Sequence, residues 1–310
     1  MRPFEFAQRR WAWIVLLLLF GAGPLHAQNL PFVNTGITSF VDGMPAPRGL
    51  KFQEFFVFAT ADKINNSNGN EISGLPDVDL FVYASQIVYT PEKNVPLINA
   101  QLDLTVVQLF VLDELKFDAN GTGIGDMFIG PAFQWDPIIL DSGPVFAHRL
   151  ELDAIIPVGQ YNSSRLSNPS SNFFSFNPYW AATFLLTERW AASTRLHYLW
   201  NAPNDNPNKV LFPGAGSTQA GQAFHMNFAS SYSVTRPLRV GLAGYYLRQF
   251  TDSKVDGQNV TGTRQEVLGV GPGMFYEFSQ GIMVMNAYAD LFSKNRIQGM
   301  LFVWRIAVKF

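Results

Sequence analysis

The C-terminal stretch from Gln298 to Phe310, QGMLFVWRIAVKF, alternates in polarity and ends on an aromatic residue. Its large apolar residues fall on one face, whereas Arg305 and Lys309 fall on the other, which predicts a β-strand with one apolar side. A chain end is usually polar and frayed, so such a strand needs an apolar surrounding and a neighbour for its backbone groups. A closed barrel in lipid supplies both. We therefore predict an all-β fold, a transmembrane antiparallel β-barrel over residues 48–310.

The composition favours a barrel over a helical membrane protein. The chain has 310 residues with 28 Phe, 10 Tyr and 7 Trp, yet only 15% of its residues are charged. Its longest apolar stretch after the N-terminal region, Val267 to Tyr276, is broken by Gly and Pro, whereas a spanning helix needs about 20 apolar residues. The absence of cysteine excludes disulfides and thiolate metal sites, and we expect neither a metal nor a cofactor.

The N-terminus has the features of a secretory signal peptide. Three Arg residues precede or adjoin the apolar run from Trp11 to Phe20, and Ala27 offers a small residue for cleavage. The run is too short for a membrane anchor, and the residues around Arg9 and Arg10 do not match the twin-arginine pattern. We predict Sec-type export after removal of residues 1–27, which takes three Arg and one Glu away and changes the net charge from −2 to −4. This charge gives no reason to expect a nucleic-acid partner.

Alternation between turn signals predicts twelve strands. Three links are tight turns, and they alternate with long polar stretches, which is typical of short periplasmic turns and longer extracellular loops. An even strand number in this order also predicts that both termini lie in the periplasm. The predicted strands are 48–59, 77–90, 100–110, 124–135, 145–156, 174–186, 190–200, 223–234, 238–250, 264–278, 282–290 and 298–310, and the tight turns are 187–189, 235–237 and 279–281.

Some predicted strands are irregular. Pro131 and Pro272 each remove a hydrogen-bond donor from a ladder, so we expect bulges or bends beside the glycines that precede them. In the first strand, Phe55, Phe56 and Phe58 occupy both faces. Either aromatic rings line part of the interior there, or a bulge reverses the facing.

Polar side chains recur on one face of several predicted strands. Arg149, Glu151 and Asp153 alternate with apolar residues, and a charge that faces lipid at mid-membrane costs about 2–4 kcal/mol. Such residues therefore point into the lumen, where they either select solutes or simply pair with one another. His197 and His225 would suit a catalytic site, but no nucleophile motif such as G-x-S-x-G is present, so we predict no catalytic residues and no enzyme. The predicted lumen-lining residues are Arg149, Glu151, Asp153, Arg195, His197, His225, Asn227 and Arg305.

Aromatic residues near strand ends have two further predicted roles. Trp and Tyr are expected at the two membrane interfaces, in contact with outer-membrane lipid and lipopolysaccharide. Trp304 and the terminal Phe310 form the predicted signal for the barrel-assembly machinery. The predicted interfacial girdle is Trp135, Tyr179, Trp190, Trp200, Tyr276 and Trp304.

Several segments resemble a known bacterial family. The resemblance is carried by LPFVNTGITSFVDGMPAPRGLKFQEFFVFATADK (30–63), ELDAIIPVGQYN (151–162), NPYWAATFLLTERWAASTRLHYLWNAPNDNP (177–207) and LRVGLAGYYLRQFTDSKVDG (238–257). These segments are similar to the meta-pathway phenol-degradation proteins, which are also described as transporters, and the likeness covers nearly the whole mature chain. It implies uptake of small aromatic or hydrophobic compounds across the outer membrane.

A lumen of twelve strands is intermediate between one filled by side chains and an open aqueous channel. Residues 28–47, rich in Pro and turn formers, are expected to form a periplasmic segment or to plug the lumen, so we expect a narrow, partly obstructed passage for passive diffusion. Under the family resemblance, Phe173, Phe174 and Phe176 would contact the solute. The alternative is a closed barrel that acts as a structural or surface-interaction protein through its extracellular loops, notably Asn201 to Gln222.

Overall fold

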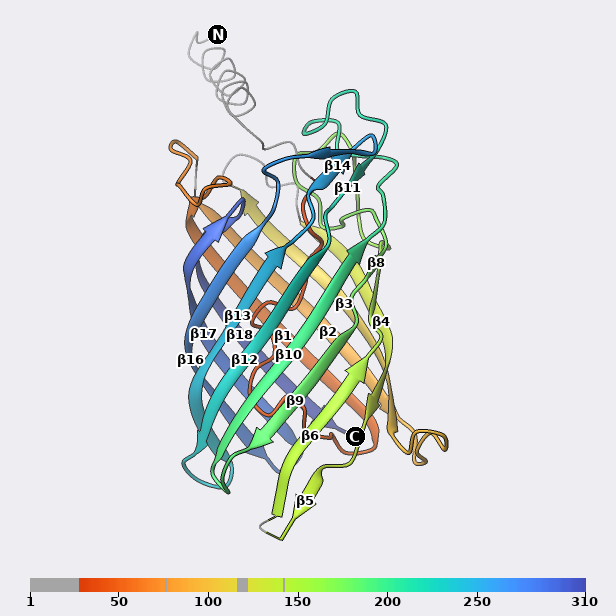
Figure 1. Ribbon diagram of the computed structural model, residues 1–310, viewed down its shortest axis with the longest axis vertical. Coiled ribbons are helices and arrows are strands. Elements are labelled where there is room, and N and C mark those ends of the chain that lie inside the picture. Colours follow the sequence, from red (N-terminus) through yellow and green to blue (C-terminus); the bar gives the residue numbers. More distant parts are fainter. Residues whose placement is uncertain (1–27, 76, 116–121, 142) are drawn as a thin grey trace, which may run out of the picture.

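Pairing between the first and last strands closes the sheet into a barrel. Strand β1 (Gly49–Ile64) pairs antiparallel with β18 (Ile297–Lys309), from Lys51 opposite Lys309 to Ile64 opposite Ile297 (Figure 1). The computed structural model describes residues 28–75, 77–115, 122–141 and 143–310, so the predicted signal peptide lies outside the described residues. None of the described residues belongs to a helix long and apolar enough to cross a membrane.

Twelve positions around the barrel are filled, as predicted. Strands β6 and β7 share one position, β8 and β9 share another, and β5 is a short hairpin partner of β6. Strands β11, β14 and β15 form a separate small sheet. The remaining bounds are β2 (Val78–Thr90), β3 (Gln101–Leu115), β4 (Gly123–Gln134), β5 (Ile138–Leu140), β6 (Gly143–Glu151), β7 (Ala154–Ile156), β8 (Ser175–Phe176), β9 (Tyr179–Leu185), β10 (Trp190–Asn201), β11 (Thr218–Gln219), β12 (Ala223–Ser233), β13 (Leu238–Gln249), β14 (Ser253–Val255), β15 (Gln258–Val260), β16 (Glu266–Phe278) and β17 (Gly281–Lys294).

The two ends of the barrel differ in their connections. We call the end that carries Phe310 and the tight turns the turn end, and the opposite end, which carries β11, β14 and β15, the loop end (Figure 1). Two turn-end links are longer than the tight turns, namely 91–100 and the link that contains β5, whereas β17 and β18 are joined at the loop end by 295–296 alone. The short and long connections therefore alternate less strictly than predicted.

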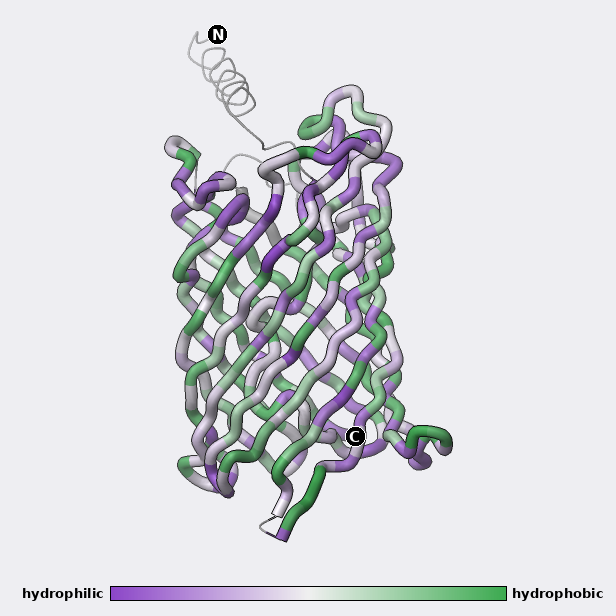
Figure 2. The backbone as a smooth tube through the Cα atoms, in the orientation of Figure 1, coloured by the Kyte–Doolittle hydropathy of each residue, from purple (hydrophilic) through white to green (hydrophobic). Residues whose placement is uncertain are grey.

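The strands alternate between an apolar outer face and a buried inner face. On β1 and β18, Phe58, Phe302 and Trp304 are exposed on the outside, whereas Val57 and Val303 are buried inside. Figure 2 shows hydrophobic and hydrophilic residues alternating along the barrel strands. An exposed apolar band on a closed barrel is the surface that lipid covers.

Both prolines lie where one ladder is interrupted. Of the two predicted alternatives, a bulge is wrong at these positions because the register does not change. Pairing of β4 passes from Ile129–Ala154 to Ala132–Glu151 without a change of register. Pairing of β16 with β17 likewise keeps its register across the gap around Pro272. The preceding glycines allow a close approach, since a Cβ at Gly271 would lie 1.8 Å from the carbonyl oxygen of Ala287. True register shifts occur elsewhere, between Ala61 and Lys63, Gln108 and Phe110, Ile138 and Ile139, and Leu268 and Gly269.

The register of β1 is continuous through its phenylalanines, so no bulge reverses the facing there. Phe55 is buried inside the barrel, whereas Phe56 packs on the outside against Tyr83 and Trp304 at ring distances of 5.4 and 5.2 Å. The first of the two alternatives is therefore the observed one, because an aromatic ring lines the interior.

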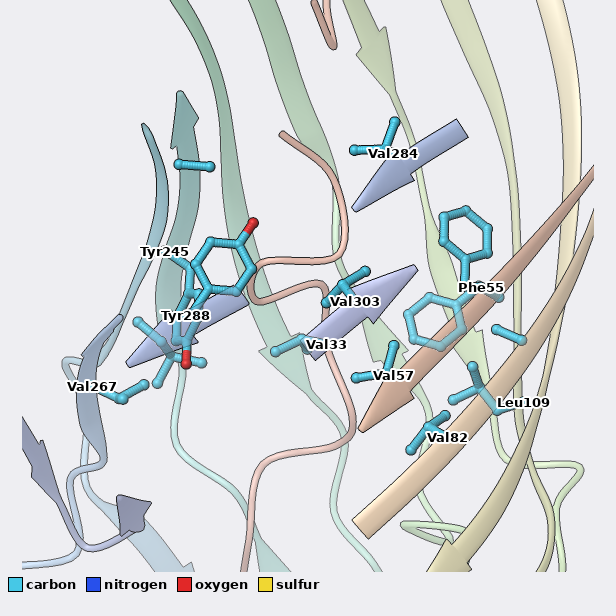
Figure 3. Packing of buried hydrophobic residues seen from close by; sticks show 14 of the residues in the cluster. Val33, Phe55, Val57, Val82, Leu109, Tyr245, Val267, Val284, Tyr288 and Val303 are labelled. Carbon is cyan, nitrogen blue, oxygen red and sulfur yellow. The ribbon is translucent and has the colours of Figure 1, made fainter. Parts of the chain in front are cut away.

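The buried apolar cluster lies inside the barrel rather than between separate layers. It joins inner side chains of opposite walls to residues of the N-terminal segment, 28–47. Figure 3 shows Val33 of this segment close to Val57 of β1 and Val303 of β18. The chain's own N-terminal residues thus occupy part of the lumen.

Replacing Gly271 by Ala should destabilise the barrel by about 1–3 kcal/mol, the usual cost of overpacking a site that cannot yield. The new Cβ would collide with the backbone of β17, 1.8 Å from the Ala287 carbonyl oxygen. Urea unfolding in lipid vesicles, followed by Trp fluorescence, measures the change. Gly216→Ala is the control, because its nearest atom is Asp256 Oδ1 at 3.4 Å. Equal unfolding midpoints for the two variants would contradict the packing described at β16.

Candidate functional site

The N-terminal segment runs through the barrel from the loop end to the turn end (Figure 1). At the loop end, Thr218 Oγ1 donates a hydrogen bond to Gln28 Oε1 at 2.6 Å, and Gln265 Nε2 donates to Asn29 Oδ1 at 3.3 Å. At the turn end, Lys51 Nζ donates to the carbonyl oxygen of Pro47 at 2.9 Å. The prediction that both termini lie at the same end is therefore wrong for the described residues, since Gln28 lies among the long loops.

Midway along the lumen, side-chain and backbone groups of the segment form hydrogen bonds with the inner wall. Asn227 Nδ2 donates to Asn34 Oδ1 at 2.8 Å, and its Oδ1 accepts from Gly36 N at 2.8 Å. From the opposite wall, Tyr288 Oη donates to the Gly36 carbonyl oxygen at 2.9 Å. Gly36 has a φ of +80°, a conformation that favours glycine. The segment is thus bonded to β12 and β17 at one residue.

Gly43 is a second point where the segment touches the wall closely. Its amide donates to Thr183 Oγ1 at 2.9 Å, and its carbonyl oxygen accepts from Gln134 Nε2 at 3.2 Å. A Cβ at this position would lie 2.6 Å from backbone atoms of Ala182 and Thr183. A residue with a side chain cannot occupy this position unless the segment moves away from β9.

Between these contacts, Asp42 forms an ion pair with Arg195 of β10. Arg195 Nε lies 2.5 Å from Asp42 Oδ2 and Nη2 lies 2.7 Å from Oδ1, and the two side chains are only 10% and 6% exposed. The preceding residue, Val41, has a φ of +49°, which is unusual for a β-branched residue. Such backbone costs on the order of 1–3 kcal/mol and persists only where surrounding contacts hold it. The ion pair and the Gly43 contacts supply that restraint.

A second charged network adjoins the first. Asp103 of β3 lies 3.7 Å from Lys51 Nζ and 3.8 Å from Arg149 Nη1. Arg149 Nη2 donates to Glu151 Oε2 at 2.7 Å, and Tyr179 Oη donates to the same oxygen. The Arg195 guanidinium lies over the Tyr179 ring at 4.0 Å, so Tyr179 connects the two networks. Charges buried in a barrel interior need such partners because their desolvation is costly.

Arg305 of β18 lies in the same region without a carboxylate partner. Its Nε and Nη2 donate to Gln53 Oε1 at 2.9 and 2.5 Å, and its guanidinium lies over the Phe55 ring at 5.6 Å. No ion pair joins it to a described carboxylate, although the charge of Asp42 acts on it through space. Arg305 is therefore a half-buried cation whose charge is only partly balanced.

His197 and His225 stack on each other beside these networks. Their ring centroids are 4.0 Å apart with planes 15° from parallel, and both rings are fully buried. His225 Nε2 bonds to Asn177 Oδ1 at 2.9 Å, while the two His197 nitrogens have no hydrogen-bond partner among the described residues. Neither imidazole bonds to a hydroxyl group in that part of the chain, and no three described His, Asp or Glu residues are placed to hold a metal ion.

Two cavities occupy the lumen on either side of the segment's middle. The turn-end cavity has a volume of about 880 Å³ and is lined by Asp42, Arg149, Arg195 and Arg305 among others. The loop-end cavity has a volume of about 450 Å³. Four apolar residues line both cavities and form what we call the constriction: Phe32, Ile37, Leu109 and Phe128.

The predicted lumen residues all lie inside the barrel, in two groups. Arg149, Glu151, Asp153, Arg195, His197 and Arg305 line the turn-end cavity. His225 and Asn227 are buried against Asn177 and the segment instead. Asp42 and Asp103 are not among the residues predicted from the sequence. Asp42 is the only acidic residue within 28–47, and Asp103 alternates with Leu102 and Leu104, so both carried a signal.

The predicted aromatic contacts are only partly brought together. Phe173 is buried, whereas Phe174 and Phe176 are exposed on the outer side of β8, where Ser175 faces inward. None of the three lines either cavity, and their contact with a solute stays a prediction.

The girdle prediction is wrong for Tyr179. Its side chain points into the barrel, where it is 5% exposed and its hydroxyl donates a hydrogen bond to Glu151. Trp190, Tyr276 and Trp304 are exposed on the outside, and Trp304 lies near the middle of β18. Trp135 stacks on His148 at the turn end, at 4.7 Å, and Trp200 lies 6.5 Å from the Phe174 ring.

Comparison with known proteins agrees with this architecture. Residues 61–306 match the family model described as "Putative MetA-pathway of phenol degradation". The chain belongs to this family. The resemblance noted in the sequence is thereby confirmed, and no curated protein matches the sequence significantly.

Among solved structures, the COG4313 outer membrane channel from Pseudomonas putida F1 is similar to this family member. The TM-score is 0.73 at 17% identity, with 90% of this chain and 100% of that chain covered. A Pseudomonas aeruginosa FadL homologue gives a TM-score of 0.38 at 9% identity over 84% of this chain and 89% of that chain, which is too low to support any statement. The first likeness shows that the fold is that of an outer-membrane β-barrel protein.

Replacing Arg195 by Gln should release the N-terminal segment. Breaking a buried ion pair costs about 3–5 kcal/mol because the remaining charge is left buried without a partner. Hydrogen exchange followed by mass spectrometry should therefore show faster exchange in peptides from residues 28–47, while the barrel strands keep their protection. Arg264→Gln is the matched control, because Arg264 forms a similar two-point pair with Asp252 on the exposed loops. Unchanged exchange in the segment of the Arg195 variant would show that this pair does not hold it.

Proposed function

We propose that this protein is an outer-membrane channel for the passive uptake of small hydrophobic or aromatic compounds through a narrow lumen that residues 28–47 partly obstruct. The observation that carries the proposal is the pair of cavities, about 450 and 880 Å³, separated by an apolar constriction. The family description refers to phenol degradation, and the COG4313 protein of similar fold is an outer membrane channel. The second of these supports transport, and we propose no enzymatic role.

The constriction suits apolar solutes better than ions. Its four side chains are Phe, Ile, Leu and Phe, so an ion at this point would lose hydration without gaining a partner. A small aromatic solute would lose fewer contacts with water there than an ion would, and its ring could pack against those of Phe32 and Phe128. We propose that solute enters the loop-end cavity from outside, passes the constriction when the segment shifts, and leaves through the turn-end cavity into the periplasm.

The remaining parts of the proposal concern delivery and placement. We propose Sec-type export, assembly by the barrel-assembly machinery, and contact of the outer face with lipid and lipopolysaccharide. Phe310 is 77% exposed in the folded barrel. The exposed rings of Trp190 and Tyr276 are suited to the membrane interfaces.

Deletion of residues 28–47 should raise the flux of aromatic solutes several-fold, because it removes Phe32 and Ile37 from the constriction. Uptake of radiolabelled phenol and benzyl alcohol by proteoliposomes, above that of protein-free vesicles, measures this flux. Folding of both proteins is checked by their resistance to unfolding in detergent before heating. If neither version conducts any solute, the channel proposal fails and the closed barrel that acts through its loops takes its place.

Gly43→Ala should also raise the flux, by less than the deletion. The new Cβ cannot coexist with the backbone of β9 and displaces the segment locally without changing any charge. The same proteoliposome assay applies, with Gly216→Ala as the control because that glycine lies in an open loop. Flux equal to that of the unaltered protein would mean that the position of the segment does not limit passage.

A further inference from the structure

The segment presents one carboxylate to a group of three arginines on the barrel wall. Asp42 is bonded at two points by Arg195, and the positive charges of Arg305 and Arg149 act on the same carboxylate. These arginines come from three separate strands, β10, β18 and β6, and all line the turn-end cavity. Two-point contact between a guanidinium and a carboxylate is the geometry by which proteins recognise carboxylates.

The wall around Asp42 has a surplus of positive charge. Seven basic side chains line the turn-end cavity, and the wall itself contributes four acidic side chains, namely Asp103, Glu151, Asp153 and Glu277. Asp42, from the segment, is the fifth acidic side chain of the lining. Among the described residues, Arg305 has no ion-pair partner and Arg149 Nε has no hydrogen-bond partner. The wall therefore has cationic groups left over for a further anion.

The surroundings of this carboxylate are apolar and aromatic. Asp42 follows Phe40 and Val41 in the chain, and Phe40 is buried in the apolar cluster. Tyr179 lies beneath the Arg195 guanidinium at 4.0 Å and Phe55 beneath that of Arg305 at 5.6 Å. The segment thus places the carboxylate of Asp42, with Phe40 close by in the chain, among arginines that lie over aromatic rings.

We propose that the turn-end cavity is a binding site for aromatic carboxylates, in which Arg195, Arg305 and Arg149 hold the solute carboxylate in the place that Asp42 occupies in this structure. The inference rests on the proposed channel function and names its solute class. A solute that competes with Asp42 binds only the state in which the segment has moved, so it increases the population of that state. The strained backbone at Val41 is relaxed in the same step.

The test compares two solutes that differ in charge but hardly in shape, phenylacetate and phenylacetamide. Binding to the purified full mature protein in detergent is measured by isothermal titration calorimetry. Asp42→Asn should tighten phenylacetate binding on the order of tenfold. The variant has no carboxylate of its own that competes with the solute for the arginines, so the binding-competent state is more populated. Binding of phenylacetamide should not change. Asp252→Asn, which removes the acid of the similar exposed pair with Arg264, should leave both affinities unaltered.

Arg305→Gln tests the wall independently, because Arg305 forms no ion pair with the segment. This variant should weaken phenylacetate binding on the order of tenfold while exchange protection of residues 28–47 is retained. Acetate and phosphate test whether the aromatic part matters, and both should bind far more weakly than phenylacetate.

Three results would overturn the inference. They are equal affinity for phenylacetate and phenylacetamide, no gain in affinity in the Asp42 variant, and acetate or phosphate binding as tightly as phenylacetate. The outcome is separable from the channel proposal, because phenol flux through the segment-deleted barrel does not depend on a carboxylate site. Flux of phenol without selective phenylacetate binding would retain the channel and reject the site.

Discussion

The ion pair between Asp42 and Arg195 is the interaction on which the interior depends. A barrel of twelve strands encloses more space than its own inner side chains fill, and inward arginines in that space need counter-charges. Here the chain supplies both packing and charge from a segment that precedes the first strand. The same contact therefore fixes the path of the segment and balances part of the cationic wall, while Phe32 and Ile37 of the segment lie between the two cavities of the lumen.

The outer and inner faces of each strand are subject to different constraints. The outer face only has to be apolar, and it tolerates the exposed rings of Phe58, Phe302 and Trp304 in any order. The inner face is specified residue by residue, because a buried polar atom without a partner is costly. The residues that hold the segment therefore lie on the inner face, where Asn227 and Thr183 accept hydrogen bonds from its backbone amides.

The fold could be predicted from sequence because alternation with a period of two is a local property of the chain. The closing strand up to Phe310 and the inward side of Arg149 and Glu151 follow from it directly. The partner of Arg195 does not, because Asp42 is 153 residues away and lies in a stretch without any period.

Tyr179 was misassigned to the girdle for a related reason, since position near a strand end does not say which face a residue takes. The register continues past Pro272, and the glycine before it, Gly271, leaves no room for a side chain beside the neighbouring strand.

The central claim is that passage requires the N-terminal segment to move. Because the chain lacks cysteine, a disulfide between Ser39→Cys and Asn286→Cys can tie the segment to β17, where Ser39 Oγ and Asn286 Oδ1 are 3.3 Å apart. The measurement is phenol flux into proteoliposomes before and after reduction of this disulfide. The account predicts low flux when the disulfide is formed and recovery to the level of the unaltered protein after reduction. Equal flux in both states would contradict it, because solute would then pass a segment that cannot move.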